Sequence, residues 1–137
     1  VIDTPMDHDS IKGIGSMFGT GAMIMLDETA SIVRASRVLA HFYDHESCGQ
    51  CSQCREGTQW LHEIFRRIEL GKGRPEDVAE LERLSHQMAP GKTICALSDA
   101  AAIPTLAVVR HFRAELEAQI AAAGSPAVAP QPEEVQA

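Results

Sequence analysis

The sequence predicts an all-α fold, a four-helix bundle, and three observations support this prediction. Four segments between residues 29 and 123 carry apolar side chains at helical spacing. Glycine or proline interrupts the chain between several of these segments, and the connections are short, as in an up-and-down bundle. The chain has 137 residues, which is enough for one domain with a hydrophobic core.

Residues 1–28 differ in character from the rest. A glycine-rich stretch at residues 13–21 leads into a short apolar run, Ala22 to Leu26. The length of this run and the glycines before it predict one buried strand rather than a helix. A single strand needs partners, so we expect its sheet to lie upstream of Val1, in a longer polypeptide.

The first two helices are expected on either side of a cysteine-rich loop. The first runs from about Thr29 to Tyr43. Its predicted apolar face consists of Ile32, Ala35, Leu39 and Phe42. The second ends at Gly71 and Gly73. Its predicted apolar face consists of Trp60, Leu61, Ile64, Phe65 and Ile68.

The third helix is expected to start at Pro75-Glu76-Asp77, because proline and acidic residues favour a first turn, and to stop before Pro90. Its apolar face consists of Val78, Leu81, Leu84 and Met88. Ser98 and Asp99 can cap a fourth helix, whose regular part is expected to begin near Pro104. Its apolar face consists of Ile103, Leu106, Val109, Phe112, Leu116 and Ile120. Residues 124–137 are predicted to be a disordered tail.

Four cysteines carry the clearest chemical signal. Cys48, Cys51 and Cys54 lie between the first two helices, and Cys95 lies between the last two. An even number of helices separates the two loops, so a bundle brings them to the same end. Three closely spaced thiolates with a remote fourth favour a [4Fe-4S] cluster at that end. Spacing alone leaves zinc or disulfides open, although zinc usually binds paired C-x2-C motifs.

Other features favour no competing site. The net charge of −7 and the lack of a basic stripe argue against nucleic-acid binding, and no apolar run approaches the roughly 20 residues of a membrane span. His41 and His45 are interpreted as surface or capping residues rather than ligands. Arg55 and Lys92, each close to a cysteine, are either solvated or raise the potential of the cluster.

Two longer motifs resemble a known family. They are Glu46-Ser47-Cys48-Gly49-x-Cys51-x-x-Cys54-Arg55-Glu56-Gly57 and Thr93-Ile94-Cys95-Ala96-Leu97-x-Asp99-Ala100-Ala101. Both are similar to the C-terminal iron–sulfur domain of the flavin-binding, NADH-oxidising (F-type) subunit of respiratory complex I, NADH-quinone oxidoreductase. Residues 15–21 resemble the end of the β-grasp-like domain that precedes it. Ser98 departs from the family pattern, in which glycine is frequent.

The resemblance implies a division into a β-grasp-like remnant (1–28), a helical iron–sulfur domain (29–123) and a tail (124–137). It implies that NADH reduces FMN, and that the [4Fe-4S] cluster takes single electrons from the flavin and passes them along an iron–sulfur chain toward quinone. Cys48, Cys51, Cys54 and Cys95 would be the ligands, and two further residues, Ala96 and Leu97, would face the flavin. The FMN and NAD sites of the family lie upstream, so this fragment would relay electrons without oxidising NADH.

The partners implied by the resemblance are the upstream FMN/NADH domain and other iron–sulfur subunits of the peripheral arm of complex I. No nucleic acid and no direct membrane span are expected. The implied location is cytoplasmic, on the inner face of the cell membrane through the complex, or the matrix side in a mitochondrion. Alternatives are the diaphorase subunit of an NAD-linked formate dehydrogenase or hydrogenase, and a zinc-stabilised interaction module.

Overall fold

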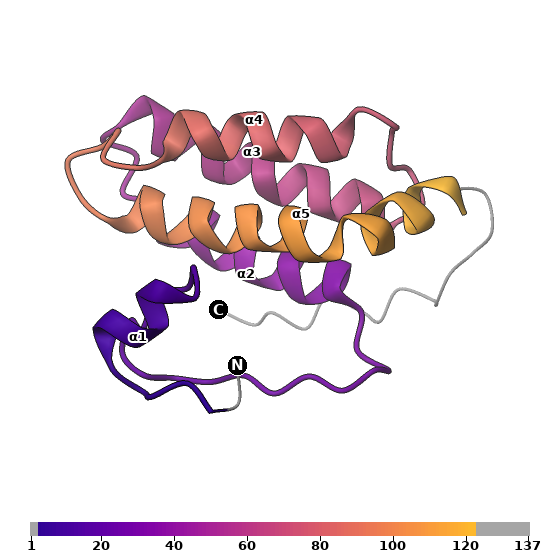
Figure 1. Ribbon diagram of the computed structural model, residues 1–137. Coiled ribbons are helices and arrows are strands. Elements are labelled where there is room, and N and C mark those ends of the chain that lie inside the picture. Colours follow the sequence, from indigo (N-terminus) through magenta and orange to yellow (C-terminus); the bar gives the residue numbers. More distant parts are fainter. Residues whose placement is uncertain (1–2, 123–137) are drawn as a thin grey trace.

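The computed structural model describes residues 3–122, and this part of the chain is helical, as the sequence predicts. The helices are α1 (His8–Gly13), α2 (Ile32–Glu46), α3 (Ser52–Glu69), α4 (Asp77–Met88) and α5 (Leu97–Ala121). Helices α2 to α5 lie side by side, while α1 and the segment after it lie along one side of them (Figure 1).

Local signals set the ends of the long helices. The Ser31 hydroxyl accepts the Arg34 N–H at 3.2 Å and so caps the start of α2. At the end of α3, Gly71 adopts a φ of +68°, a conformation that glycine takes without strain. Helix α4 ends before Pro90, as predicted. These ends leave two connections, 47–51 and 89–96, free to form loops.

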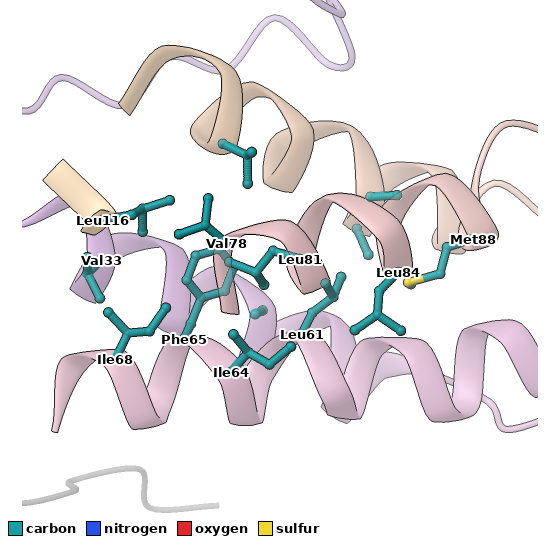
Figure 2. Close-up of a cluster of buried hydrophobic side chains, with 14 of the residues drawn as sticks. Val33, Leu61, Ile64, Phe65, Ile68, Val78, Leu81, Leu84, Met88 and Leu116 are labelled. Carbon is teal, nitrogen blue, oxygen red and sulfur yellow. The ribbon is translucent and has the colours of Figure 1, made fainter. Parts of the chain in front are cut away.

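The hydrophobic core lies between the four long helices and runs along most of their length, from Val33 near the start of α2 to Met88 at the end of α4 (Figure 2). Phe65 is at its centre, with 1% of its surface exposed. The four apolar residues predicted for α4 are all buried, and so is the predicted stripe of α3 except Trp60. Each large side chain that is fully buried contributes about 1.5–3 kcal/mol. The core therefore holds the helices in place, and of the two loops that carry cysteines it uses Ala89.

The predicted inner face of α2 is wrong by one position. Val33, Ser36 and Ala40 are buried, whereas Leu39 and Phe42 are 37% and 53% exposed. Two of the inward residues, Ser36 and Ala40, are small. The prediction relied on the spacing of large apolar side chains, and it therefore chose the neighbouring face of the helix.

The strand predicted at residues 22–26 is not formed within the described residues. The segment is extended but pairs with no other, and Ile24 and Met25 are 84% and 86% exposed. No strand occurs anywhere in residues 3–122, so the segment has no edge to join. The polar stretch before it forms α1 instead, because the Asp7 carboxylate accepts the Ser10 N–H at 2.8 Å.

The start of the last helix differs from the prediction as well. Helix α5 begins at Leu97 and continues through Pro104, and its irregular point is Phe112, with φ −124° and ψ 21°. Ser98 and Asp99 do not cap the helix: the Ser98 hydroxyl donates to the Met88 carbonyl at the end of α4, and the Asp99 carboxylate accepts the Gly91 N–H of the loop. The predicted disordered tail lies outside the described residues. Within the described part, no helix is both long and apolar enough to cross a membrane.

Candidate metal centre

The two cysteine-bearing loops lie at the same end of the helices (Figure 1). Helices α2 and α4 both run toward this end, and α3 and α5 both leave from it. Cys48 is in the first loop, Cys51 is the N-cap of α3, and Cys54 is in the first turn of α3 rather than in the loop. Cys95 lies just before α5. The arrangement places both parts of the predicted ligand set at one end.

The first loop is held in a tight turn. Gly49 has a φ of +76°, which residues with a side chain rarely adopt. Its carbonyl oxygen accepts a hydrogen bond from Nη1 of Arg55 at 2.8 Å. The Cys51 carbonyl accepts the N–H groups of Cys54 and Arg55 at 3.1 and 2.9 Å. The backbone between the first and third cysteines is therefore fixed by the start of α3.

The hydroxyl of Ser47 lies next to the sulfur of a candidate ligand. Its Oγ lies 3.3 Å from Sγ of Cys54, which is buried. The Gly49 N–H donates to the same Oγ at 3.4 Å. Because this contact occupies a lone pair of the hydroxyl, its own proton is free to point at the sulfur. A thiolate at Cys54 would accept that proton's hydrogen bond.

The second loop is tied to the helices on both sides. The Gly91 N–H donates to the Asp99 carboxylate, at 3.1 and 3.2 Å from its two oxygens. The buried Ser98 hydroxyl donates to the Met88 carbonyl at 3.0 Å. Near the cysteine itself, the Thr93 hydroxyl donates to the Cys95 carbonyl at 2.8 Å. Ser98, the departure from the family pattern, thus joins the end of α4 to the start of α5.

The donor set fits an iron–sulfur cube better than a single ion. All four cysteines are free thiols, and Cys48 and Cys95 are exposed. Among residues 3–122, no three cysteine sulfurs lie within 4.8 Å of one another. A single zinc ion would need its thiolates close together on one tetrahedron, whereas a cube carries each thiolate on a separate iron. The described cysteines are therefore not gathered as a single zinc ion would require.

The two predicted cations differ in their surroundings. Arg55 is half-exposed but not merely solvated, because its guanidinium binds Gly49 and pairs with Glu56 at 2.8 Å. Lys92 is exposed on the second loop.

Of the two residues predicted to face a flavin, Ala96 is exposed and Leu97 is half-buried. Beside them, Ile94 is 82% exposed, which is unusual for a large apolar side chain next to a site.

Sequence reasoning missed three contacts. Ser47 and Asp99 bind the cysteine loops through hydrogen bonds that depend on the fold. His41, interpreted as a surface residue, lies instead against His62 of the neighbouring helix, with ring centroids 4.7 Å apart. The spacing of His41 and Asp44 along one helix was the only signal available in the sequence, because their partner lies on α3.

Comparison with known proteins agrees with this chemistry. Residues 34–119 match the family described as the NADH-ubiquinone oxidoreductase-F iron–sulfur binding region. The chain is 45% identical over 125 residues to the F subunit of NADH-quinone oxidoreductase of Mycobacterium tuberculosis, covering 91% of this chain and 28% of that protein. It is 49% identical over 115 residues to the mitochondrial NADH-ubiquinone oxidoreductase 51 kDa subunit of Neurospora crassa, covering 84% of this chain and 23% of that one.

A solved structure is similar as well. A chain of an NAD+-reducing [NiFe]-hydrogenase in the H2-reduced state superimposes with a TM-score of 0.64 and 33% sequence identity, over 69% of this chain and 16% of that one. This chain thus spans about a quarter of the length of the curated relatives it matches.

Proposed function

Since this chain belongs to the family of the NADH-ubiquinone oxidoreductase-F iron–sulfur binding region, we propose that it is the electron-transferring part of an NADH dehydrogenase subunit. In the complete subunit, electrons from NADH reach FMN, pass singly through this chain, and move along further iron–sulfur centres toward quinone. The FMN and NAD sites belong to the larger part of the subunit, which this chain does not span.

The ligands proposed for the [4Fe-4S] cluster are Cys48, Cys51, Cys54 and Cys95, at one end of a four-helix bundle formed by residues 29–123. The single observation that carries this proposal is that both cysteine loops lie at the same end of the helices (Figure 1). When bound, the cluster supplies one-electron redox chemistry that needs no proton transfer.

The residues around these cysteines position and tune the thiolates. The Ser47 hydroxyl, 3.3 Å from Sγ of Cys54, would donate a hydrogen bond to a thiolate there and so stabilise negative charge on that sulfur. Arg55 holds the Gly49 carbonyl, which keeps the first loop folded around its sulfurs. Asp99 holds the Gly91 N–H and fixes the second loop on the start of α5.

The surface beside Cys95 is the proposed route for incoming electrons. Ala96 and Leu97 face the flavin, and the exposed Ile94 packs against the FMN/NADH domain of the same subunit. Residues 1–28 are the end of a preceding β-grasp-like domain. Iron–sulfur subunits of the peripheral arm receive the electrons, on the inner face of the cell membrane or the matrix side of a mitochondrion.

Rapid mixing with NADH tests this function. The anaerobically purified chain and the complete subunit are each mixed with NADH while the absorbance of the cluster is followed. Bleaching is expected in the complete subunit only, and dithionite is expected to bleach both. Bleaching of the chain alone by NADH would place a nucleotide site within these 137 residues and contradict the proposal.

A second candidate is the diaphorase part of an NAD-linked hydrogenase or formate dehydrogenase. The similarity to the NAD+-reducing hydrogenase favours it, although that identity is 33%, against 45% and 49% for the complex I relatives. Purifying the complete subunit with its natural partners separates the two. Quinone reduction by the isolated complex supports complex I, and hydrogen or formate oxidation supports the alternative.

A further inference from the structure

A second group of ligand-type side chains lies on α2 and α3, apart from the cysteines. It consists of His41 and Asp44 on α2 and His62 on α3. One ligand atom from each residue lies within 4.8 Å of the other two, and all three residues are half-buried. His62 is two turns along α3 from Cys54, about 12 Å at 1.5 Å per residue. The group therefore shares no residue with the proposed cluster ligands.

The distances within the group suit a single metal ion. Nδ1 of His62 lies 3.3 Å from Oδ2 of Asp44, and the rings of His41 and His62 are tilted by 40° with centroids 4.7 Å apart. In a tetrahedral zinc site with bonds of about 2.0–2.1 Å, neighbouring ligand atoms are about 3.3 Å apart. One edge of such a tetrahedron is already present, and His41 places a third ligand atom within 4.8 Å of the other two.

The His41 ring lacks a partner that an ion would provide. Its Nδ1 atom is buried and accepts or donates no hydrogen bond within the described residues. A buried polar atom without a partner is unfavourable, commonly by about 1–3 kcal/mol. A metal ion takes a lone pair from one nitrogen of a neutral imidazole and fixes which nitrogen carries the proton. A cation bound by this group would therefore give the His41 ring a partner that the protein does not supply.

We propose that His41, Asp44 and His62 bind a divalent ion of the zinc type, with the fourth position open to water. Two imidazoles and one carboxylate are a common zinc ligand set, and zinc sites with three protein ligands take a water in the fourth position. Because the ligands come from two helices, the ion ties α2 to α3 behind the first cysteine loop. This proposal does not rest on the proposed function, because it uses none of the cysteines.

Zinc binding to the anaerobically purified chain, with its iron–sulfur cluster in place, tests the site. Calorimetric titration with Zn2+ is expected to show one ion per chain in addition to the iron. X-ray absorption at the zinc edge is expected to show nitrogen and oxygen ligands only. Sulfur ligands would mean that zinc had entered the cysteine site, and no binding would mean that His62 and Asp44 form only a hydrogen bond. Either result overturns the proposal.

Matched variants assign the ligands. His62→Gln and Asp44→Asn are each expected to weaken zinc binding by at least about tenfold. Mutation of a residue that only hydrogen-bonds to a metal ligand already lowers metal affinity by about tenfold or more. His45→Gln, an exposed histidine on the same helix, is expected to bind zinc as the unchanged chain does. If His62→Gln loses helical content, Asp44→Asn and the zinc-edge spectrum still decide. Equal affinity in Asp44→Asn and the unchanged chain would remove Asp44 from the site.

Discussion

Gly57 lies directly against Met88, so that a Cβ added to Gly57 would fall 2.5 Å from the Met88 sulfur and 2.8 Å from its Cγ. Gly57 is one turn after Cys54 on α3, and Met88 is the last residue of α4. The absence of a side chain at Gly57 therefore lets the two helices approach at the end where the cysteines lie. Met88 is 1% exposed and has little space into which to move.

We expect Gly57→Ala to lower the free energy of unfolding by about 1 kcal/mol. Overpacking a core commonly costs about 1–3 kcal/mol, and alanine regains up to about 1 kcal/mol in helix propensity. Urea denaturation of the reduced chain measures the change. Gly13→Ala is the matched control, because nothing lies within 4 Å of its new Cβ. In a Met88→Ala background the same Gly57→Ala change should be neutral or stabilising; an equal loss there would show that the contact is not its cause.

The stability of the chain should fall in acid partly through Asp77. Burial raises the pKa of this fully buried carboxyl, but the hydrogen bonds from the Arg67 guanidinium and from the Arg74 N–H, the latter at 2.9 Å, outweigh burial and hold the pKa below its ordinary value. A pKa lowered by folding stabilises the protein above the unfolded value of about 3.9. This stabilisation is complete above about pH 5 and is lost as the pH falls through the lowered pKa.

Asp77→Asn tests this linkage. The variant should be less stable by about 2 kcal/mol at pH 7, somewhat below the 3–5 kcal/mol of a fully buried pair, because Arg67 is 31% exposed. Its stability should also change less than that of the unchanged chain between pH 5 and pH 3. Glu80→Gln, which removes an exposed pair with Arg83, serves as control and should cost under about 1 kcal/mol. Parallel pH curves for the Asp77 variant and the unchanged chain would exclude the linkage.

The sequence alone predicts the helical class and the loops that carry the cysteines. The spacing of large apolar residues indicates the helices, and helix breakers indicate where the chain leaves them. It fails where small or polar residues decide the packing. Ala40 rather than Leu39 faces the core, because a small residue lets α2 pack against its neighbours. Pro104 is tolerated inside α5, so the expected start of that helix is late. The strand at 22–26 depends on partners that the described residues do not contain.

The candidate site divides in the same way. The cysteines can be found from spacing, since a cluster needs only a short motif and one distant ligand. The groups that support them cannot, because Ser47, Asp99 and His62 act through contacts that exist only after the helices have packed. Whether the four cysteines bind the cluster remains a prediction of their spacing and of the family.

Cys95→Ser should lose the four-iron cluster or convert it to a smaller one. Cys95 is 41 residues from Cys54 in the sequence but its loop lies at the same end of the helices. Iron and sulfide analysis, with an EPR spectrum of the reduced protein, measures the outcome. Ser98→Ala changes a serine near Cys95 that lies outside the proposed ligand set, and it should keep the cluster. A complete four-iron centre in Cys95→Ser would reject Cys95 as a required ligand.

Removal of the metal should destabilise the helices. The cluster would join the loop between α2 and α3 to the loop between α4 and α5, so binding is coupled to folding. The apo chain, prepared by chelation under reducing conditions, should melt at least about 4–8 °C below the loaded chain, which corresponds to about 1 kcal/mol. Calorimetry of both forms provides the comparison. Identical melting temperatures would mean that the helical core alone holds the two loops together.

Ser47→Ala should lower the midpoint potential of the cluster. The Ser47 hydroxyl lies 3.3 Å from Sγ of Cys54, and the Gly49 N–H donates to the same hydroxyl at 3.4 Å, which leaves the hydroxyl proton free to donate to a thiolate. A hydrogen bond to a ligand sulfur favours the reduced, more anionic state. If the bond differs by about 0.5–1 kcal/mol between the two redox states, the shift is on the order of 20–40 mV, since a tenfold change in a one-electron equilibrium is about 59 mV. Potentiometric titration followed by EPR measures it.

Ser52→Ala changes an exposed serine two residues before Cys54 and serves as the control, which should leave the potential unchanged. Equal potentials for the Ser47 and Ser52 variants would show that Ser47 gives the sulfur no hydrogen bond.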